Sequence, residues 1–541
     1  MPPTPESIAD CIHTLESLVA EPGLLANVDR ETRTRLVMAA GRLSRPSRAE
    51  QTQLSRARSK QAKRERRAAD EALLVQAGIR QKRLAPVFVT PEPAALAAAG
   101  GGSFERALTG TPEASVTRGA SSTPSSVDAT ASAATSADAA ATSEGPRLSS
   151  PRHCYVCKAS CDRMHAYYDQ MCGPCGDFNY QKRSQTADLR GRVALISGAR
   201  VKIGYQAAIL LLRSGCRVIV STRFPRDAAL RYAREVDYDT WKDRLQIYGL
   251  DLRVTPSVEA FAEHLNRHLD RLDFVLHNAC QTVRRPTGFY RHLMAAELAA
   301  ARDLPESARP LLTGYESLRG ATPEVEPALG ALARGGSLAG LFAAPELSQV
   351  ALTLDDRERD PALFPEGRLD ADLQQVDRRA LNSWRLPLDQ VGTVELLEVQ
   401  LVNAIAPFVL NGKLRALMTR ERTFEKHIVN VSAMEGQFYR AFKTDKHPHT
   451  NMAKAALNMM TRTSAPDYAR DGIFMNSVDT GWVTDEDVEH IAQRKRDESG
   501  FHPPLDIVDG AARIVDPIFD GVNTGRHMWG QFLKDYRPTA W

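Results

Sequence analysis

The sequence predicts an α/β fold with a doubly wound parallel sheet, preceded by a small cysteine module and a helical N-terminal region. Three observations lead to this prediction. From residue 189 onward, short apolar runs alternate with stretches of helical periodicity. The first of these runs, residues 193–197, is followed at once by Gly198, and a helical pattern opens at about Ile203. Ahead of this region stand two C-x-x-C pairs between Cys154 and Cys175.

The composition is that of a globular protein with more than one domain. The chain has 541 residues, of which 43% are hydrophobic and 25% charged. The net charge of +4 is too small to argue for nucleic-acid binding by the chain as a whole. We find no basic and then apolar leader at the N-terminus, and no apolar run as long as a membrane span. Five of the eight cysteines lie within residues 154–175, which favours a metal site in a reducing compartment, so we expect a cytoplasmic protein.

Residues 1–90 are expected to form a basic helical region. Apolar residues recur at helical spacing in two segments within residues 5–45, and residues 47–83 predict one longer helix. The lysines and arginines of that helix fit either a solvated face or a patch for nucleic acid or an acidic partner. Residues 91–150 are rich in Pro, Ala, Gly, Ser and Thr. Such a stretch cannot bury enough apolar surface to fold, so we expect a disordered linker.

Residues 151–186 are expected to bind zinc. Each C-x-x-C pair can place two thiolates on one turn, and 14 residues separate the two pairs. Four thiolates at this spacing suit tetrahedral Zn²⁺, and a closed set of four would be structural rather than catalytic. Unligated buried cysteines or a redox pair are the alternatives, although the context of a redox pair is absent. The predicted ligands are Cys154, Cys157, Cys172 and Cys175, with Cys161, His153 and His165 as spare donors.

Residues 192–221 predict a strand–turn–helix–strand unit. Such a unit seats the pyrophosphate of a dinucleotide on a helix N-terminus, where glycine lets the backbone approach the phosphates. Further apolar runs extend this unit into a Rossmann-like sheet. The predicted strands are residues 193–197, 217–221, 245–249, 274–277, 427–431 and 473–478, with a last strand near residues 530–533.

Six motifs, in this order along the chain, resemble those of the short-chain dehydrogenase/reductase family. They are residues 197–204, 251–252, 277–280, 402–403, 450–457 and 476–483. The resemblance covers about residues 190–290 and 395–541. It implies that residues 187–541 form a Rossmann-like domain that binds a nicotinamide dinucleotide and acts on a small-molecule carbonyl or alcohol. It also implies a dimer or tetramer formed through the helices that carry Asn403 and Lys454.

For the cofactor, the resemblance implies a site at the glycine turn, the end of the second strand and the adenine pocket. Lys202 stands where the family has its middle glycine, and with Arg200 it can add positive charge beside the phosphates. Arg223 follows the second strand, where an arginine favours a 2′-phosphate and therefore NADP(H) over NAD(H), unless it is an ordinary surface arginine. The expected cofactor residues are Ser197, Gly198, Arg200, Lys202, Ile203, Gly204, Arg223, Asp251, Leu252, Asn278, Ala279 and Lys454.

For catalysis, the resemblance implies a tetrad of which only part is present. Lys454 and Asn403 match the family's lysine, which binds the nicotinamide ribose, and its asparagine, which holds a water. Thr450 takes the place of the tyrosine that moves the proton. An aliphatic hydroxyl is too weak an acid for that task, so another group must supply the proton if the protein turns over.

The catalytic serine of the family is displaced as well. The S-x-x-G spacing counted back from Gly436 arrives at Ala433, and Ser432 lies one residue earlier. On a strand this places Ser432 on the opposite face, unless a bulge restores it. The expected catalytic residues are Asn403, Ser432, Thr450 and Lys454. Other candidates for the proton donor are Tyr439, His447 and His449, although each is also an ordinary loop residue.

About 125 residues separate Asn278 from Asn403, where the family fold needs only a loop and one helix. Alanine- and glycine-rich sequence, as at residues 330–337, indicates a poorly ordered insertion at about residues 290–390. Because it leaves from the cofactor side of the sheet, the insertion also suits a lid.

These observations support three hypotheses about function. The first is an NADP(H)-dependent oxidoreductase in which a non-standard group moves the proton. The second is a nucleotide-binding scaffold or redox sensor without turnover, which the missing tyrosine favours and the retained lysine and asparagine oppose. The third is a nucleic-acid binder built on residues 47–83 and the zinc module, which salt-dependent binding to a random duplex would test.

Overall fold

A computed structural model describes residues 4–93, 144–320, 338–358, 360–438 and 443–541. The chain forms two compact units, residues 1–72 and 73–541, and each is described by itself.

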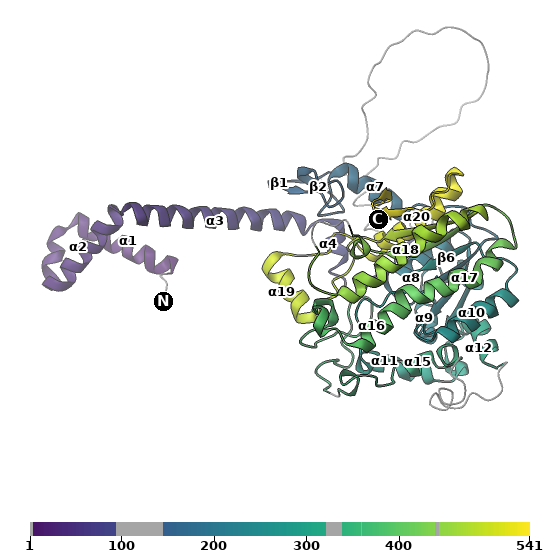
Figure 1. Ribbon diagram of the computed structural model, residues 1–541. Coiled ribbons are helices and arrows are strands. Elements are labelled where there is room, and N and C mark those ends of the chain that lie inside the picture. The colour runs from purple at the N-terminus through teal and green to yellow at the C-terminus, as the bar shows by residue number, and fades with distance from the viewer. Residues whose placement is uncertain (1–3, 94–143, 321–337, 359, 439–442) are drawn as a thin grey trace, which may run out of the picture. The chain divides into compact units, whose positions relative to one another are not determined.

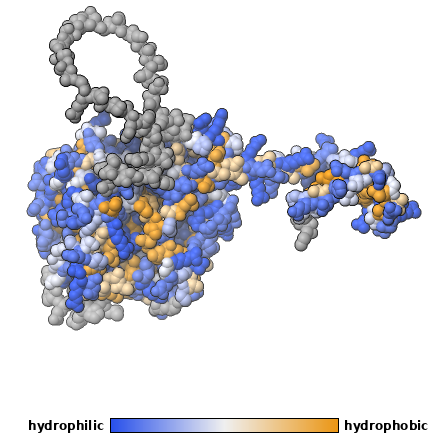
Figure 2. Space-filling view, turned by 180° about the vertical axis from the view of Figure 1, so that it is seen from behind, coloured by the Kyte–Doolittle hydropathy of each residue, from blue (hydrophilic) through white to orange (hydrophobic). Residues whose placement is uncertain are grey.

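The N-terminal unit is helical, as expected. It contains α1 (Pro5–Ala20), the 3₁₀ turn η1 (Pro22–Asn27), α2 (Arg30–Ser44) and most of α3 (Arg48–Leu74). Asp29 caps α2 by accepting a hydrogen bond from the N–H of Thr32 at 2.9 Å. Neither α1 nor α2 has a buried residue, and Val19 and Leu43 are among their exposed apolar side chains. Figure 2 shows apolar residues among hydrophilic ones on the surface of this unit.

The predicted single helix over residues 47–83 is wrong at its C-terminal end. The helix α3 ends at Leu74, and the short helix α4 (Gly78–Lys82) follows in the larger unit. The break places Gly78 against the ring of Tyr167, where an added Cβ would lie 2.6 Å from a ring carbon. The helical run thus breaks next to a glycine, which is a poor helix former and here has no room for a side chain.

The larger unit is built on one eight-stranded sheet, so the predicted fold class is confirmed (Figure 1). The strand order is β10-β9-β8-β7-β6-β3-β4-β5, and all neighbours are parallel except β9 and β10. The order reverses between β3 and β6, and ligands of such sheets bind outside the carboxyl ends of the strands at that point. The strands are β3 (Val193–Ser197), β4 (Arg217–Thr222), β5 (Leu245–Gly249), β6 (Phe274–His277), β7 (Lys426–Ser432), β8 (Ile473–Asp479), β9 (Phe532–Lys534) and β10 (Arg537–Thr539).

Helices cover both faces of the sheet, as a doubly wound fold requires. The first helix after the glycine turn, α8 (Lys202–Arg213), packs against α20 (Ile507–Thr524), and α10 (Thr255–His268) packs against α17 (Ala406–Thr419). The helix α18 (Pro448–Arg470) lies along β7 and β8 and carries Lys454. The remaining helices of this unit include α9 (Pro225–Tyr232), α11 (Thr287–Leu298), α12 (Thr313–Gly320), α14 (Ala339–Phe342), α15 (Ala344–Leu347), α16 (Thr393–Gln400) and α19 (Glu489–Ser499).

Within the described residues, one helical stretch meets the length and composition of a membrane span, which we did not predict. It runs over Thr393–Thr419 with a mean hydropathy of 1.5. The stretch belongs to the α/β unit, because its parts α16 and α17 pack against α18 and α10. Core helices of soluble folds pass the same test of length and composition.

The described part of the insertion is ordered, so the prediction of a poorly ordered segment is wrong there. Tyr315 of α12 is buried, and its hydroxyl donates to the carbonyl of Leu341 at 2.9 Å. Leu341 and Phe342 join the main apolar core. These few large side chains make enough apolar contacts to order the segment, although its overall composition is rich in alanine and glycine. The run at residues 330–337, which motivated the prediction, lies outside the described residues.

The cysteine module, which precedes the sheet in the chain, packs against α20 through its helix. It consists of the antiparallel strands β1 (Glu144–His153) and β2 (Ser160–His165) and the helix α7 (Gly173–Arg183). Residues 144–150, which we assigned to a disordered linker, form the first part of β1, while residues 94–143 of that linker lie outside the described residues. Arg183 at the end of α7 forms buried ion pairs with Asp506 and Asp509 at the start of α20.

Candidate functional site

The glycine turn between β3 and α8 is tightly packed on the segment after β6. Gly198 has φ +70°, and an added Cβ would lie 2.6 Å from the Cα of Ala279. At Gly204 an added Cβ would lie 2.2 Å from the side-chain nitrogen of Asn278, which donates to the carbonyl of Gly198 at 2.9 Å. Ser197 accepts a hydrogen bond from the N–H of Ala279 at 3.2 Å. These residues therefore form one rigid unit, and both glycines are required by geometry.

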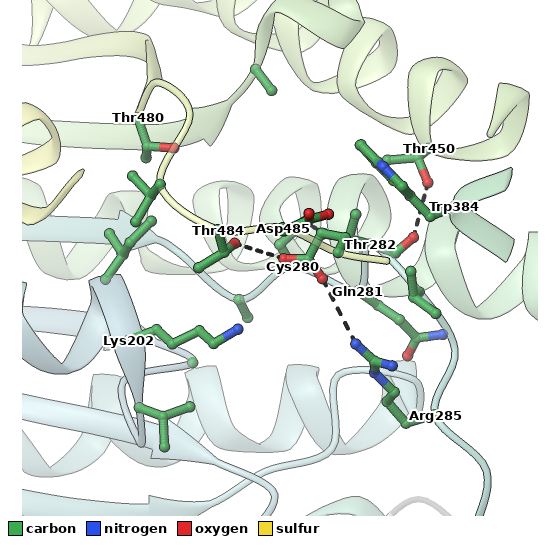
Figure 3. Close-up of a pocket in the computed structure, with 18 of the residues that line it drawn as sticks. Lys202, Cys280, Gln281, Thr282, Arg285, Trp384, Thr450, Thr480, Thr484 and Asp485 are labelled. Atoms are coloured by element: carbon green, nitrogen blue, oxygen red, sulfur yellow. Dashed lines mark hydrogen bonds and ion pairs between the residues drawn. The ribbon is translucent and has the colours of Figure 1, made fainter. Parts of the chain in front are cut away.

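Lys202 occupies the middle glycine position in a conformation that glycine would adopt more easily. Its φ is +57°, in the left-handed region that costs a side-chain-bearing residue about 1–2 kcal/mol. The side chain extends into the space that Thr484 and Arg285 also border (Figure 3). Burial disfavours its ammonium, but the carboxylates of Glu486 and Asp372 outweigh burial and raise the pKa of Lys202. Lys202 therefore lines the cleft as a cation and leaves it open.

Two arginines lie beside the end of β4. Arg223 donates to the hydroxyl of Tyr290 at 2.7 Å, and its guanidinium lies over the rings of Tyr290 and Phe224. Arg200 forms an ion pair with Asp227 at 2.7 Å and also stacks on Phe224. Both arginines line the cleft, but the charge of Arg200 is already matched by a carboxylate. Arg223 is thus the better placed of the two to meet an added phosphate.

Asp251 and Leu252 follow β5 and line the same cleft. Asp251 is fully buried and receives hydrogen bonds from the guanidinium and the N–H of Arg253. Burial would raise the pKa of Asp251, but Arg253 outweighs it and holds that pKa below its usual value. Arg253 in turn forms an ion pair with Glu398 of α16 at 2.8 Å. The part of the cleft at Asp251 is therefore tied to the helix that leads to Asn403.

The cleft has a volume of about 1370 Å³ and runs along the carboxyl ends of the strands. This exceeds the about 300–1,000 Å³ typical of small-molecule sites. Most of the predicted residues meet there. The predicted site residues that line it are Gly198, Arg200, Lys202, Ile203, Arg223, Asp251, Leu252, Asn278, Ala279, Ser432, Thr450 and Lys454. Ser197, Gly204 and Asn403 do not line it.

Lys454 and Ser432 meet at one end of the cleft. The ammonium of Lys454 donates to the carbonyl of Val431 at 2.7 Å, and the side chain is 4% exposed. The hydroxyl of Ser432 is buried and has no hydrogen-bond partner among the described residues. Both Ser432 and Ala433 line the cleft. The register of β7 with β8 is regular as far as Ser432, so no bulge turns Ser432 to the face of Ala433, and its hydroxyl is buried. A buried hydroxyl without a partner is costly.

Thr450 and Asn403 are both engaged with the segment after β6. The hydroxyl of Thr450 donates to the carbonyl of Thr282 at 3.2 Å (Figure 3). The side-chain oxygen of Asn403 accepts from the N–H of Gln281 at 2.7 Å, and its nitrogen donates to the carbonyl of the same residue. Asn403 lies in a π-helical turn, η9 (Leu401–Ile405). Such turns within α-helices are frequent at functional sites.

His447 is the candidate proton donor that reaches the cleft. It precedes α18, lines the cleft and stacks on Trp384 with ring centroids 4.0 Å apart. Burial lowers the pKa of His447 to about 4, so the ring is neutral at pH 7. His449 is 1% exposed and does not line the cleft, and Tyr439 lies outside the described residues.

Sequence reasoning missed several groups that border the cleft. Arg285 forms ion pairs with Asp377 and, at 3.9 Å, with Glu486. Glu486 lies close to Lys202, and Trp384 belongs to the insertion. Residues 368–370 and 374–377 of the insertion also line the cleft. None of these residues carries a motif, and long-range packing alone brings them together.

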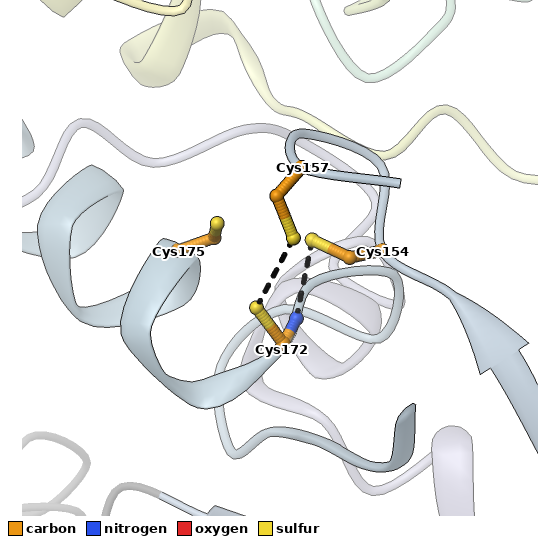
Figure 4. Close-up of side chains that lie close together, drawn as sticks. All are labelled: Cys154, Cys157, Cys172 and Cys175. Atoms are coloured by element: carbon orange, nitrogen blue, oxygen red, sulfur yellow. Dashed lines mark hydrogen bonds between the residues drawn. The ribbon is translucent and has the colours of Figure 1, made fainter. Parts of the chain in front are cut away.

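The four predicted metal ligands are brought together (Figure 4). Their sulfurs lie within 4.8 Å of one another, and the Sγ atoms of Cys157 and Cys172 are 3.8 Å apart. A tetrahedral Zn²⁺ with bonds of about 2.3 Å places its sulfurs about 3.8 Å apart, so the donor set fits this ion. Burial opposes ionisation of Cys154, but backbone N–H groups around its sulfur outweigh it and lower the pKa to about 7.

The cleft, the glycine turn and the strand order define a protein of the dinucleotide-binding α/β class. Residues 192–296 match the family model of short chain dehydrogenases, and residues 386–505 match that of enoyl-(acyl carrier protein) reductases. The chain belongs to the short-chain dehydrogenase/reductase family, whose members are NAD(P)-dependent oxidoreductases. The unmatched stretch between the two models coincides with the insertion.

The relatives differ in how much of the chain they share. The uncharacterized protein R665 of Acanthamoeba polyphaga mimivirus is 30% identical over 399 residues, or 72% of this chain and 76% of that protein. Dehydrogenase/reductase SDR family member 13 of Bos taurus is 35% identical over 18% of this chain and 27% of its own length. Retinol dehydrogenase 12 of Bos taurus is 33% identical over 20% of this chain and 36% of its own length. The chain thus spans about a third or less of these two named relatives.

Among solved structures, the NADPH-bound carbonyl reductase from chicken fatty liver is similar at a TM-score of 0.38 and 17% identity. The match covers 65% of this chain and all of that one.

Proposed function

We propose that the protein is an NADP(H)-dependent oxidoreductase that acts on a small-molecule carbonyl or alcohol. The observation that carries this proposal is the continuous cleft that joins Arg223 at one end to Lys454 and Ser432 at the other. A nicotinamide dinucleotide has these two ends, an adenosine with its phosphate and a reactive ring. The preference for the phosphorylated form rests on Arg223, which follows β4 without an acidic residue beside the ribose position.

The proposed roles follow from position in the cleft. Gly198, Asn278 and the start of α8 form the cradle for the diphosphate, and Lys202 supplies a cation next to it. The cofactor, when bound, supplies or accepts the hydride. Lys454 binds the nicotinamide ribose. Asn403 fixes the backbone of Gln281 behind the site.

Proton transfer is the step in which this chain departs from its family. Thr450 stands in the place of the tyrosine and donates to a backbone carbonyl. His447 lies three residues earlier at the cleft wall, and its neutral ring can accept a proton from an alcohol. We therefore favour His447 as the group that moves the proton. A binding protein without turnover is the second candidate, since both the tyrosine and the serine of the family are absent from their usual positions.

The domain organisation that we propose keeps a helical N-terminal region, a zinc-binding module and a dinucleotide-binding domain. Zn²⁺ would be held by Cys154, Cys157, Cys172 and Cys175 in a closed structural site. Oligomerisation through α16, α17 and α18 and a cytoplasmic location remain predictions from the sequence.

The test begins with titrations of NADPH and NADH into the full chain, in which nicotinamide fluorescence measures binding. Carbonyls and alcohols are then screened by nicotinamide absorbance, with Lys454→Ala and His447→Ala beside the wild type. We expect NADPH to bind more tightly than NADH and turnover to fall by at least tenfold in both variants. If neither NADPH nor NADH binds, the proposal is refuted, and binding without turnover on any substrate would favour the scaffold.

A further inference from the structure

The cysteine module lies against the cofactor cleft. Tyr155 stands between the ligands Cys154 and Cys157, and it lines the cleft together with Lys158 of the same loop. Its hydroxyl accepts a hydrogen bond from the backbone N–H of Trp482 at 3.0 Å. Trp482 belongs to the segment that leaves β8, three residues after Asp479. One residue of the metal loop therefore holds one residue of the cleft wall.

Two ammonium groups near the Tyr155 ring support the contact. The ammonium of Lys158 lies 5.0 Å from the ring centroid, and that of Lys534 lies 5.5 Å from it. Lys534 also forms an ion pair with Asp479 at 3.2 Å. Asp479 pairs in register with Ser432 on the neighbouring strand. The ring of Tyr155 is thus fixed by groups that themselves border the cleft.

A shared apolar cluster joins the module to the same wall. Cys154, Tyr168 and Met171 of the module are buried together with Val483 and Leu505 of the dinucleotide-binding part. At Gly481, where φ is +76°, an added Cβ would lie 2.4 Å from Leu505 and 3.2 Å from the hydroxyl of Tyr155. The segment after β8 therefore has no room to shift towards the module. Ile203 of the glycine turn packs on this cluster as well.

We infer that the metal module is a structural part of the catalytic cleft, in which metal binding fixes Tyr155 and Tyr155 positions residues 480–484. These residues include Thr480 and Thr484, whose side chains border the cleft (Figure 3). Tyr155 is a positioning residue, because it acts through the backbone of Trp482. The inference rests on the proposed function for the identity of the cofactor, while the mechanical coupling of the two segments does not depend on it.

The test uses the full chain and three forms besides the wild type: the protein stripped of metal by a chelator, Tyr155→Phe and Tyr180→Phe. Tyr180→Phe removes the same hydroxyl elsewhere in the module, where the ring packs on His165 and Tyr167. Metal content is measured by mass spectrometry, and amide hydrogen exchange is followed in peptides covering residues 154–175, 193–213 and 479–487. The emission spectrum of bound NADPH reports on the nicotinamide end.

We expect Tyr155→Phe to keep its metal and to raise exchange at residues 480–484 by about two- to tenfold, the range for loss of one hydrogen bond. Metal removal should raise exchange at residues 480–484 at least as much. Both changes should alter the emission of bound NADPH, while exchange at residues 193–213 should change by less than about twofold. Equal effects of Tyr155→Phe and Tyr180→Phe would overturn the inference. So would metal removal that loosens residues 154–175 and leaves 480–484 unchanged. If NADPH does not bind, the proposed function fails, and the exchange data still decide the coupling.

Discussion

Replacement of Arg183 by methionine should destabilise the larger unit severely. Arg183 is buried at the end of α7, and its guanidinium lies 2.7 Å from Asp506 and 2.8 Å from Asp509. The two carboxylates also accept hydrogen bonds from the hydroxyls of Tyr167 and Tyr168. Methionine fills a similar volume but leaves two buried carboxylates without their shared cation.

The expected cost is about 3–5 kcal/mol, the range found when one partner of a buried ion pair is removed. An unfolding entropy of about 2.1 cal/mol/K per residue amounts to about 1 kcal/mol/K for the unit of residues 73–541. The midpoint of thermal unfolding should therefore fall by about 3–5 °C. Arg190→Met is the matched control, since Arg190 pairs with Asp188 at 2.6 Å on the exposed surface, where such pairs contribute about 0–1 kcal/mol.

The loss should depend on pH in a defined direction. In the wild type, burial raises the pKa of Asp506, but Arg183 outweighs burial and lowers that pKa. The ion pair therefore stabilises the folded state at pH values above the unfolded pKa of about 3.9. Without Arg183, burial leaves the folded pKa of both carboxyls above the unfolded value, and stability is then lost as pH rises through the folded pKa. The deficit of Arg183→Met should accordingly be larger at pH 8 than at pH 5.5.

Differential scanning fluorimetry of the full chain at the two pH values, with equal metal content confirmed, measures both effects. A deficit below 1 °C, or one equal to that of Arg190→Met, would show that the buried pair contributes little. A deficit that grows as the pH falls would refute the assignment of the uncompensated charge to the carboxylates.

Three further changes test the cofactor and metal sites. Arg223→Gln should weaken NADPH binding by about 10- to 150-fold, the range for loss of a charged hydrogen bond, and should change NADH binding by less than about threefold. Arg217→Gln, at the exposed start of β4, is the control and should change the binding of neither nucleotide in fluorescence titrations. Gly198→Ala should abolish NADPH binding and lower the unfolding temperature, because the added Cβ would lie 2.6 Å from the backbone of Ala279. Gly191→Ala is the control, since Gly191 has a similar φ and no atom within 4 Å of an added Cβ. This control should lower the free energy of unfolding by only about 1 kcal/mol. Cys157→Ser should reduce bound zinc from one equivalent to less than a tenth by mass spectrometry; full retention would exclude this ligand set.

Sequence patterns predicted the sheet well because its strands are buried on both faces. Each strand from β3 to β8 carries a short cluster of buried apolar residues, and the predicted bounds agree with the structure to within one residue. The glycine turn could be predicted equally well from the sequence, since close contacts with the segment after β6 require glycine at Gly198 and Gly204. Here local sequence and tertiary packing demand the same residues.

The docking of the cysteine module could not be predicted in the same way. The hydroxyl of Tyr167 and the carboxylate of Asp506 lie 339 residues apart in the chain but 2.9 Å apart in space. Nothing in either local sequence marks this contact, because a tyrosine or an aspartate at a helix start is common without such a partner. Lys202 is a similar case, since the direction of its side chain depends on carboxylates from the insertion and from the segment after β8.

The pattern of retained and lost residues bears on whether the protein turns over. A nucleotide-binding scaffold has no need of a buried lysine that faces the ribose position, and burial of an ammonium is costly unless it is hydrogen-bonded. The ammonium of Lys454 has three N–H donors, of which the carbonyl of Val431 takes one at 2.7 Å. A ribose with its two hydroxyls matches the remaining donors. The hydroxyl of Ser432 is buried without a partner among the described residues. A buried ammonium that lines the cleft with donors to spare is costly without a ligand there, and this supports a bound ribose at Lys454.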